Sequence, residues 1–211
     1  MEITSPAFKE NAANALADAQ LQKALGNVRG GFIEKRQKAV SALPEFDRLR
    51  DSARDIKDHA LANLDLYLEA YEAKVIASGG HVHWAETAAD AREIILDICR
   101  SAGARTVTKG KSMVTEEIEL NDFLAANGIK PVETDLGEYI IQLRGEHPSH
   151  IIAPAVHLNK EQVEADFRRV HDHLPPTRDL REPEALLGEA RRVLRSAYFD
   201  ADVGITGANF L

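Results

Sequence analysis

The feature that most limits the fold is a change of pattern after Gly80. From there on, short extended segments alternate with segments whose apolar residues recur every three or four positions. The candidate strands are residues 81–84, 105–108, 129–134, 149–156 and 202–206. Strands that alternate with helices of this length predict an α/β fold with a mostly parallel sheet flanked by helices.

Local signals place the starts and ends of the helices. Thr87 is a suitable N-cap with a carboxylate three residues later, and it predicts a helix that runs to about residue 101. A second helix is expected before residues 127–128. Asn159 caps another helix, and Pro183 begins the last one.

The first part of the chain is expected to be a helical region, residues 1–78, preceding an α/β domain at residues 79–211. A long helix should begin near Pro44, because apolar residues recur in steps of three or four over residues 46–75. The glycines at 79–80 would end it. Two interpretations stay open for this apolar stripe: a helical arm packed on its own domain, or a surface on which another subunit docks.

Composition narrows the class of protein. The chain has 211 residues, 44% of them hydrophobic and 28% charged, which is typical of a soluble globular protein. A formal net charge of -8 argues against a nucleic-acid partner. No apolar stretch is long enough for membrane insertion and the N-terminus lacks a signal-peptide pattern, so we expect a cytoplasmic location. Cys99 is the only cysteine, too few for an iron–sulfur site within these residues.

Polar residues of both signs follow the predicted strands. Ligands of open parallel sheets bind beyond the carboxyl ends of the strands, where loops lead into helices. The residues at such positions are Lys109, Gly110, Lys111 and Ser112 after one strand, Glu133 and Asp135 after another, and His157 after a third. Lysines and helix-end amides would hold a small carboxylate, phosphate or sugar-like ligand, and the acids or the imidazole would move protons.

The loop with two lysines matches only part of a known phosphate motif. Residues 110–112 agree with the end of the Walker A loop, G-x-x-x-x-G-K-[ST]. The first glycine of that motif would fall at position 105, which is Arg105. This mismatch disfavours ATP hydrolysis. A looser anion site and two solvated lysines in a turn remain as alternatives.

The histidines do not form a specific metal motif. Seven of the eight fall into three groups: His81 and His83; His147, His150 and His157; His171 and His173. None reproduces a spacing such as H-E-x-x-H. We expect surface or hydrogen-bonding histidines and no metal site.

Several blocks stand in a fixed order along the chain. They are KGKSMVTEE at 109–117, GI at 128–129, ETDLGEYIIQL at 133–143 and PSHIIAPAVH at 148–157. Together with the helical start and the ending DVGITGANF at 202–210, they closely resemble the lactate utilization (LUD) domain family, and within it the iron–sulfur subunit of the L-lactate oxidation complex. The resemblance covers essentially all 211 residues.

This resemblance implies a fold similar to sugar-isomerase and CoA-transferase-like α/β proteins. It also implies partners, the other lactate utilization subunits, in a complex that oxidises L-lactate to pyruvate. In the family, two [4Fe-4S] clusters in a ferredoxin-like C-terminal region are expected to carry the electrons. The matched segment adds Glu138 to the candidate ligand-binding residues, whereas the catalytic residues stay unknown.

The sequence departs from the family pattern where it stops, after Leu211. Family members continue there through the rest of the LUD domain and into cysteine motifs. We therefore expect an N-terminal portion with an incomplete LUD domain, no cofactor of its own and no catalysis alone. The [4Fe-4S] clusters are expected in the full-length parent.

Three functional hypotheses follow. The first is a LUD-domain subunit of the lactate oxidation system that binds a small carboxylate, or a partner, through the loops at 109–112 and 133–138. The second is an assembly module whose loops and helical arm dock other subunits. The third is an independent isomerase-like enzyme acting on a small sugar or acyl substrate.

Overall fold

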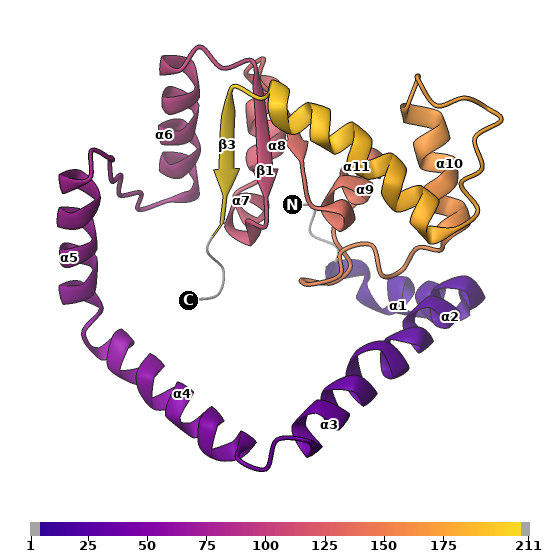
Figure 1. The fold of residues 1–211 in the computed structure, drawn as a ribbon, viewed down its shortest axis with the longest axis horizontal. Coiled ribbons are helices and arrows are strands. Elements are labelled where there is room, and N and C mark those ends of the chain that lie inside the picture. Colours follow the sequence, from indigo (N-terminus) through magenta and orange to yellow (C-terminus); the bar gives the residue numbers. More distant parts are fainter. Residues whose placement is uncertain (1–4, 208–211) are drawn as a thin grey trace. The chain divides into compact units, whose positions relative to one another are not determined.

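The computed structural model describes residues 5–207, which form an α/β fold preceded by a helical region (Figure 1). The N-terminal helices are η1 (Ser5–Ala7), α1 (Phe8–Ala17), α2 (Ala19–Val28), η2 (Arg29–Ile33), α3 (Glu34–Ser41), α4 (Phe46–Ala62) and α5 (Leu64–Ala77). The following elements are α6 (Ala88–Ser101), β1 (Thr106–Gly110), α7 (Met113–Glu117), α8 (Leu120–Ala126), β2 (Lys130–Glu133), α9 (Leu136–Arg144), α10 (Lys160–Val170), α11 (Pro183–Asp200) and β3 (Val203–Thr206). The predicted fold class is confirmed.

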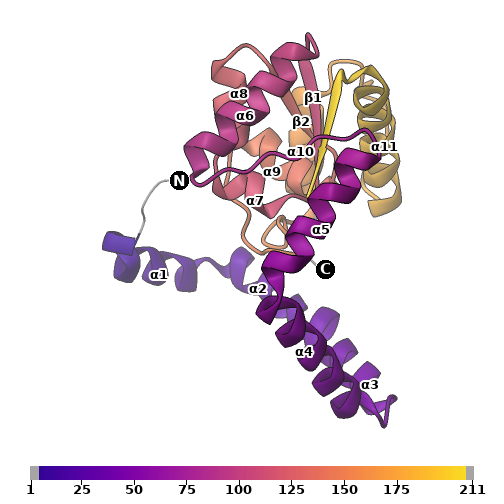
Figure 2. The same cartoon turned by 90° about the vertical axis from the view of Figure 1, so that its left-hand side faces the viewer.

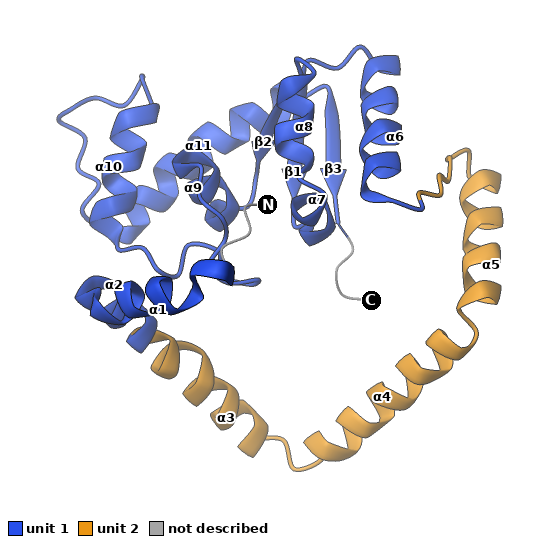
Figure 3. Ribbon diagram, turned by 180° about the vertical axis from the view of Figure 1, so that it is seen from behind, with its two compact units in different colours: residues 1–26, 86–211 blue, residues 27–85 orange. Residues whose placement is uncertain are grey.

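The chain divides into two compact units (Figure 3): residues 1–26 with 86–211, and residues 27–85. The domain boundary predicted after residue 78 stays a prediction. In the described part of the chain, no helix is both long enough and apolar enough to cross a membrane.

The sheet has three strands in the order β2-β1-β3, and both pairings are parallel. Helices α6 and α8 lie on one side of the strands and α11 on the other (Figure 2). The first side holds a core formed by Leu96, Cys99, Ala104, Val107, Leu120, Leu124 and Ile129. Cys99 is 1% exposed, and burial raises the pKa of its thiol, as fits a small buried apolar residue rather than a nucleophile.

The outer edge of β2 is closed by a side chain. Gln142 of α9 accepts a hydrogen bond from the Glu133 backbone N–H at 3.0 Å and donates one to the Pro131 carbonyl at 3.1 Å. The amide thus makes the two bonds that a neighbouring strand would make. Unpaired strand edges invite pairing with other chains, so this contact protects β2.

A second core joins α9, α10 and α11, and it contains a buried polar network. Tyr139 and His171 are 6% and 4% exposed, and the Tyr139 hydroxyl lies 2.9 Å from His171 Nε2. Nδ1 of His171 and Nε2 of His173 lie 3.1 and 3.0 Å from Glu189 Oε1. Burial raises the pKa of Tyr139 and lowers that of His171, so the neutral imidazole bridges the phenol and the carboxylate.

The predicted helix starts at Thr87 and Asn159 are confirmed. Both residues form capping boxes, with Asp90 and Gln162 as the reciprocal partners. Pro183 begins α11 as predicted. In a capping box two backbone N–H groups that the helix leaves unpaired find side-chain acceptors, which fixes where the helix begins.

Two predicted strands are wrong. Residues 81–84 and 149–156 are irregular or turn segments. In the second segment the Ser149 N–H donates to the Pro154 carbonyl, which closes a loop, and Ile151 and Ile152 are 61% and 70% exposed. An apolar run forms a strand only when a neighbouring strand takes its backbone hydrogen bonds.

The long helices also differ from the prediction. The helix expected from near Pro44 is interrupted at Asn63, between α4 and α5. The helix expected before residues 127–128 is interrupted at Glu119, whose φ of 53° is left-handed and incompatible with a continuous helix. Helix α9 has no counterpart among the predicted elements.

Candidate functional site

The carboxyl ends of β1 and β2 lie at one edge of the sheet, because the two strands are parallel and Lys109 is paired in register with Glu133. Lys111 and Ser112 follow β1, and Asp135 follows β2 and caps α9 by accepting a hydrogen bond from the Gly137 N–H. The loops predicted from residues 109–112 and 133–138 are therefore neighbours. We refer to these two loops together as the strand-end rim.

A buried ion pair lies beneath the rim. Lys109 Nζ is 2.6 Å from Glu133 Oε1, and their side chains are 1% and 5% exposed. Lys109 lies on the same face of β1 as Val107, toward the core with α8, because side chains alternate along a strand. Asn121 of α8 also donates to Glu133 Oε1, at 2.7 Å. Charges this deeply buried require such partners.

The Lys111 backbone connects the two loops. Its φ of 55° is left-handed, and its backbone N–H donates to the Glu138 carboxylate. The Lys111 ammonium forms an ion pair with Asp135, and that hydrogen bond raises the pKa of Lys111. Ser112 is also committed locally, because its hydroxyl accepts from the Thr115 N–H at 3.3 Å and caps α7.

Two glycines allow the close approach of segments around the rim. A Cβ on Gly207 would lie 2.5 Å from Ser112 Cα and 2.7 Å from the Lys111 carbonyl oxygen. A Cβ on Gly110 would lie 3.0 Å from Thr134 Oγ1. The segment after β3 therefore lies directly against the loop after β1, and only glycine fits at position 207 without displacement.

Two carboxyl groups near the rim are easier to protonate than usual. Burial, followed by repulsion from Glu133, raises the pKa values of both Glu116 and Glu138. Glu138 Oε2 is buried and has no hydrogen-bond partner among residues 5–207. Carboxyl groups with raised pKa values beside a ligand site are suited to accepting and releasing protons.

A cavity of about 410 Å³ lies beside these groups, bounded by α7, α8, β2, α9 and the loop after α9. Its described lining contains six acidic side chains and neither lysine nor arginine; the acids are Glu116, Glu119, Asp122, Glu133, Glu138 and Glu146. Such a lining repels anions. An anionic ligand would therefore be held at the rim, where the Lys111 side chain is 74% exposed, and not inside the cavity.

His157 belongs to a different cluster, in a loop that follows no strand. Its Nδ1 lies 2.8 Å from Ser149 Oγ and its Nε2 lies 3.0 Å from Glu146 Oε2.

The rim brings together the other predicted residues, which are Lys109, Gly110, Lys111, Ser112, Glu133, Asp135 and Glu138. In the part of the chain that the structure describes, no cluster of His, Cys, Asp or Glu is suited to hold a metal ion.

Sequence reasoning missed two residues of this site, Glu116 and Asn121. Glu116 lies within the matched block at 109–117, but only the path of α7 brings its side chain to Glu133. Asn121 lies near the start of α8, with no motif around it. Alternation along β1 was a usable signal for Lys109, because it places this residue on the face of buried Val107.

The comparison with protein families identifies the chain. A model described as the LUD domain matches residues 68–211. The chain belongs to the LUD domain family. No solved structure matches it, so the expected likeness to sugar-isomerase and CoA-transferase-like proteins stays a prediction.

Similar proteins match along the whole of this LUD-family chain. It is 41% identical over 211 residues to a lactate utilization protein B of Bacillus velezensis, covering 100% of this chain and 44% of that protein. The same protein of Bacillus subtilis is 39% identical over 100% of this chain and 43% of its own length. An Escherichia coli protein named uncharacterized electron transport protein YkgF is 41% identical over 96% of this chain and 42% of its own length. The chain thus spans less than half the length of these curated relatives.

Proposed function

We propose that this chain acts in lactate utilization, as part of a longer protein that takes part in oxidising L-lactate to pyruvate and in passing on the electrons. Membership of the LUD domain family and similarity to proteins named for lactate utilization and electron transport support this role. The proposed partners are other lactate utilization subunits in one complex.

The observation that carries the proposal is the charged rim at the carboxyl ends of β1 and β2. Oxidation of lactate to pyruvate removes two electrons and two protons and leaves the carboxylate unchanged. In the proposed arrangement Lys111 holds the lactate carboxylate and Glu138, with its raised pKa, accepts a proton. The second proton and the two electrons leave to an acceptor outside this chain.

The residues of this chain do not fit an iron–sulfur cluster. Such clusters are held by several cysteine thiolates, whereas Cys99 is the only cysteine here and lies in the apolar core. We therefore propose that the expected [4Fe-4S] clusters belong to the longer protein, outside these 211 residues.

Thermal unfolding of the longer protein with L-lactate, pyruvate or phosphate tests the binding site. We expect lactate and pyruvate to raise the melting temperature, and Lys111→Ala to reduce that shift. Lys130→Ala is the matched control, since this exposed lysine lies at the other end of β2. Absence of a shift with any ligand, or equal shifts in the wild type and Lys111→Ala, would overturn the binding proposal.

A second candidate function is assembly. None of the helices α1–α5 contains a buried residue, while apolar side chains such as Ile56, Tyr71 and Ile76 are 69%, 60% and 58% exposed. Exposed apolar side chains in such number typically mark an interaction surface. In this role the helical region docks another subunit and the rim makes no chemical contribution.

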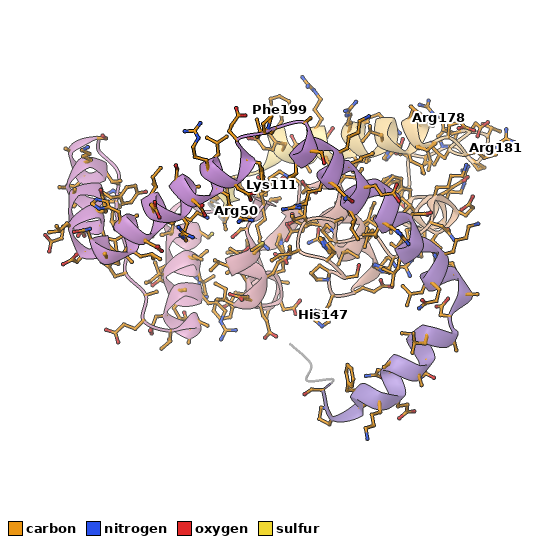
Figure 4. The ribbon with its side chains drawn as sticks, turned by 90° about the horizontal axis from the view of Figure 1, so that it is seen from below. Arg50, Lys111, His147, Arg178, Arg181 and Phe199 are labelled. Carbon is orange, nitrogen blue, oxygen red and sulfur yellow. The ribbon has the colours of Figure 1, made fainter. Side chains whose placement is uncertain are left out.

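Co-purification of the longer protein with the other lactate utilization subunits tests docking through the helical region. If assembly is the role, Ile56→Glu and Tyr71→Glu should abolish co-purification while Lys111→Ala leaves it intact. Arg50→Glu, a charge change on the same helix as Ile56, is the control (Figure 4). Retention of the partners by both glutamate variants would exclude docking through this surface.

A further inference from the structure

A second cavity, separate from the acidic one, lies between α11 and the segment that follows β2. Its volume is about 590 Å³, within the range of small-molecule sites. It is lined by Thr134, Leu136, Leu187, Ala190, Arg191, Leu194, Arg195, Tyr198 and Phe199. Thr134 and Leu136 flank Asp135, so this α11 groove opens at the carboxyl end of β2, where α/β folds bind ligands.

The charge of the groove is opposite to that of the molecule. The chain has a formal net charge of -8, yet the charged side chains of this lining are two arginines, Arg191 and Arg195. They stand one helical turn apart on the same face of α11. Among residues 5–207 neither forms an ion pair with a carboxylate, in contrast to the neighbouring Arg192, which pairs with Glu189 at 2.7 Å. Two guanidinium groups so arranged suit a phosphate, which accepts several charged hydrogen bonds at once.

Aromatic rings stand beside this positive charge. Tyr198 and Phe199 lie in the last turn of α11 and are 66% and 71% exposed. The Arg195 guanidinium lies over the Phe199 ring, 5.1 Å from its centroid. Leu136 and Leu194, both partly buried, supply an apolar floor. A flat ring system would bury apolar area here and stack on the exposed aromatic side chains.

We propose that the α11 groove binds a nucleoside phosphate, with the phosphate on Arg191 and Arg195 and the base against Tyr198 and Phe199. This assignment rests on two observations. The positive charge of the arginines complements the negative charge of a phosphate, and the groove combines an apolar floor and exposed rings with these arginines. The base is held by its flat face, so adenine and guanine nucleotides should bind alike. This site does not depend on the lactate proposal, because it shares neither Lys111 nor Glu138 with it.

Isothermal titration calorimetry on the longer protein, with ADP, GDP, adenosine and pyrophosphate as probes, tests the proposal. ADP and GDP should bind with similar affinity, and adenosine and pyrophosphate more weakly. The double variant Arg191→Ala/Arg195→Ala should weaken ADP binding roughly tenfold or more, since a hydrogen bond to a charged group contributes about that much. Tyr198→Ala should weaken ADP and adenosine binding but leave pyrophosphate binding unchanged.

The control is Arg178→Ala, which removes the same charge from an exposed position before the other end of α11, well away from Phe199 (Figure 4). It should bind ADP as the wild type does. Failure of the wild type to bind ADP would overturn the proposal. This is also the result expected if a segment of the longer protein fills the groove. Equal binding by wild type and the double arginine variant would also overturn it. Lys111→Ala should retain ADP binding, which separates this result from failure of the lactate site.

Discussion

Breaking the buried ion pair beneath the rim should destabilise the protein strongly. In Lys109→Met the Glu133 carboxylate, 5% exposed, loses its ammonium partner. Removing one partner of a buried pair costs about 3–5 kcal/mol in the free energy of unfolding. We expect the lower end, about 3 kcal/mol, because Asn121 still donates to Glu133 Oε1. For a domain of this size the melting temperature should fall by roughly 6–12 °C.

The double variant Lys109→Met/Glu133→Gln tests the cause. It removes both charges and keeps an amide oxygen that accepts from Asn121, so stability should return to within about 1 kcal/mol of the wild type. Urea unfolding followed by circular dichroism gives the three differences, for Lys109→Met, Glu133→Gln and the double variant. Because Glu133→Gln alone leaves the Lys109 ammonium buried and unpaired, the coupling energy should be at least roughly 2 kcal/mol. The reasoning is refuted if Lys109→Met costs less than about 1 kcal/mol or if the two substitutions simply add.

Three further outcomes are expected. Glu138→Gln should raise stability at neutral pH, because the folded state raises the pKa of Glu138 and so disfavours its charged form. The gain in stability should disappear as the pH falls below 4.5, the ordinary pKa of a glutamate. A stability difference that stays constant across a urea-denaturation pH series would contradict this. Asn159→Ala should cost about 1 kcal/mol by removing the cap bonded to the Gln162 N–H, measurable by thermal unfolding. Gly207→Ala should lower the melting temperature and abolish any lactate-induced shift, since its Cβ would meet Ser112; an unchanged shift would show that the loop adapts.

Helix starts were predictable because their signals are local. A capping box uses residues three positions apart, so Thr87 and Asn159 predicted the starts of α6 and α10 without any knowledge of the fold. The parallel sheet followed from the alternation of elements, and three of the five predicted strands are present. The two that are wrong, at residues 81–84 and 149–156, failed because strand formation depends on a distant partner for the backbone.

The rim was predictable in part, for a similar reason. The topological rule places ligands beyond strand ends, and it selected Lys109, Lys111, Glu133 and Asp135 from strand positions alone. It also selected His157, because residues 149–156 resembled a strand. The burial of Lys109 could be read from strand alternation, because this residue shares a face of β1 with Val107. The raised pKa of Glu138 arises from packing by helices and has no local signature.

The Gln142 amide that closes the edge of β2 determines at which edge a further strand can join this sheet. Among the described residues β3 has a strand neighbour on one side only, whereas β2 is bounded by β1 and by the Gln142 side chain. Any strand added by more polypeptide or by another protein must therefore pair with β3. Enlargement of the sheet would then place new loops beside Gly207 and leave the acidic cavity at the opposite margin unchanged.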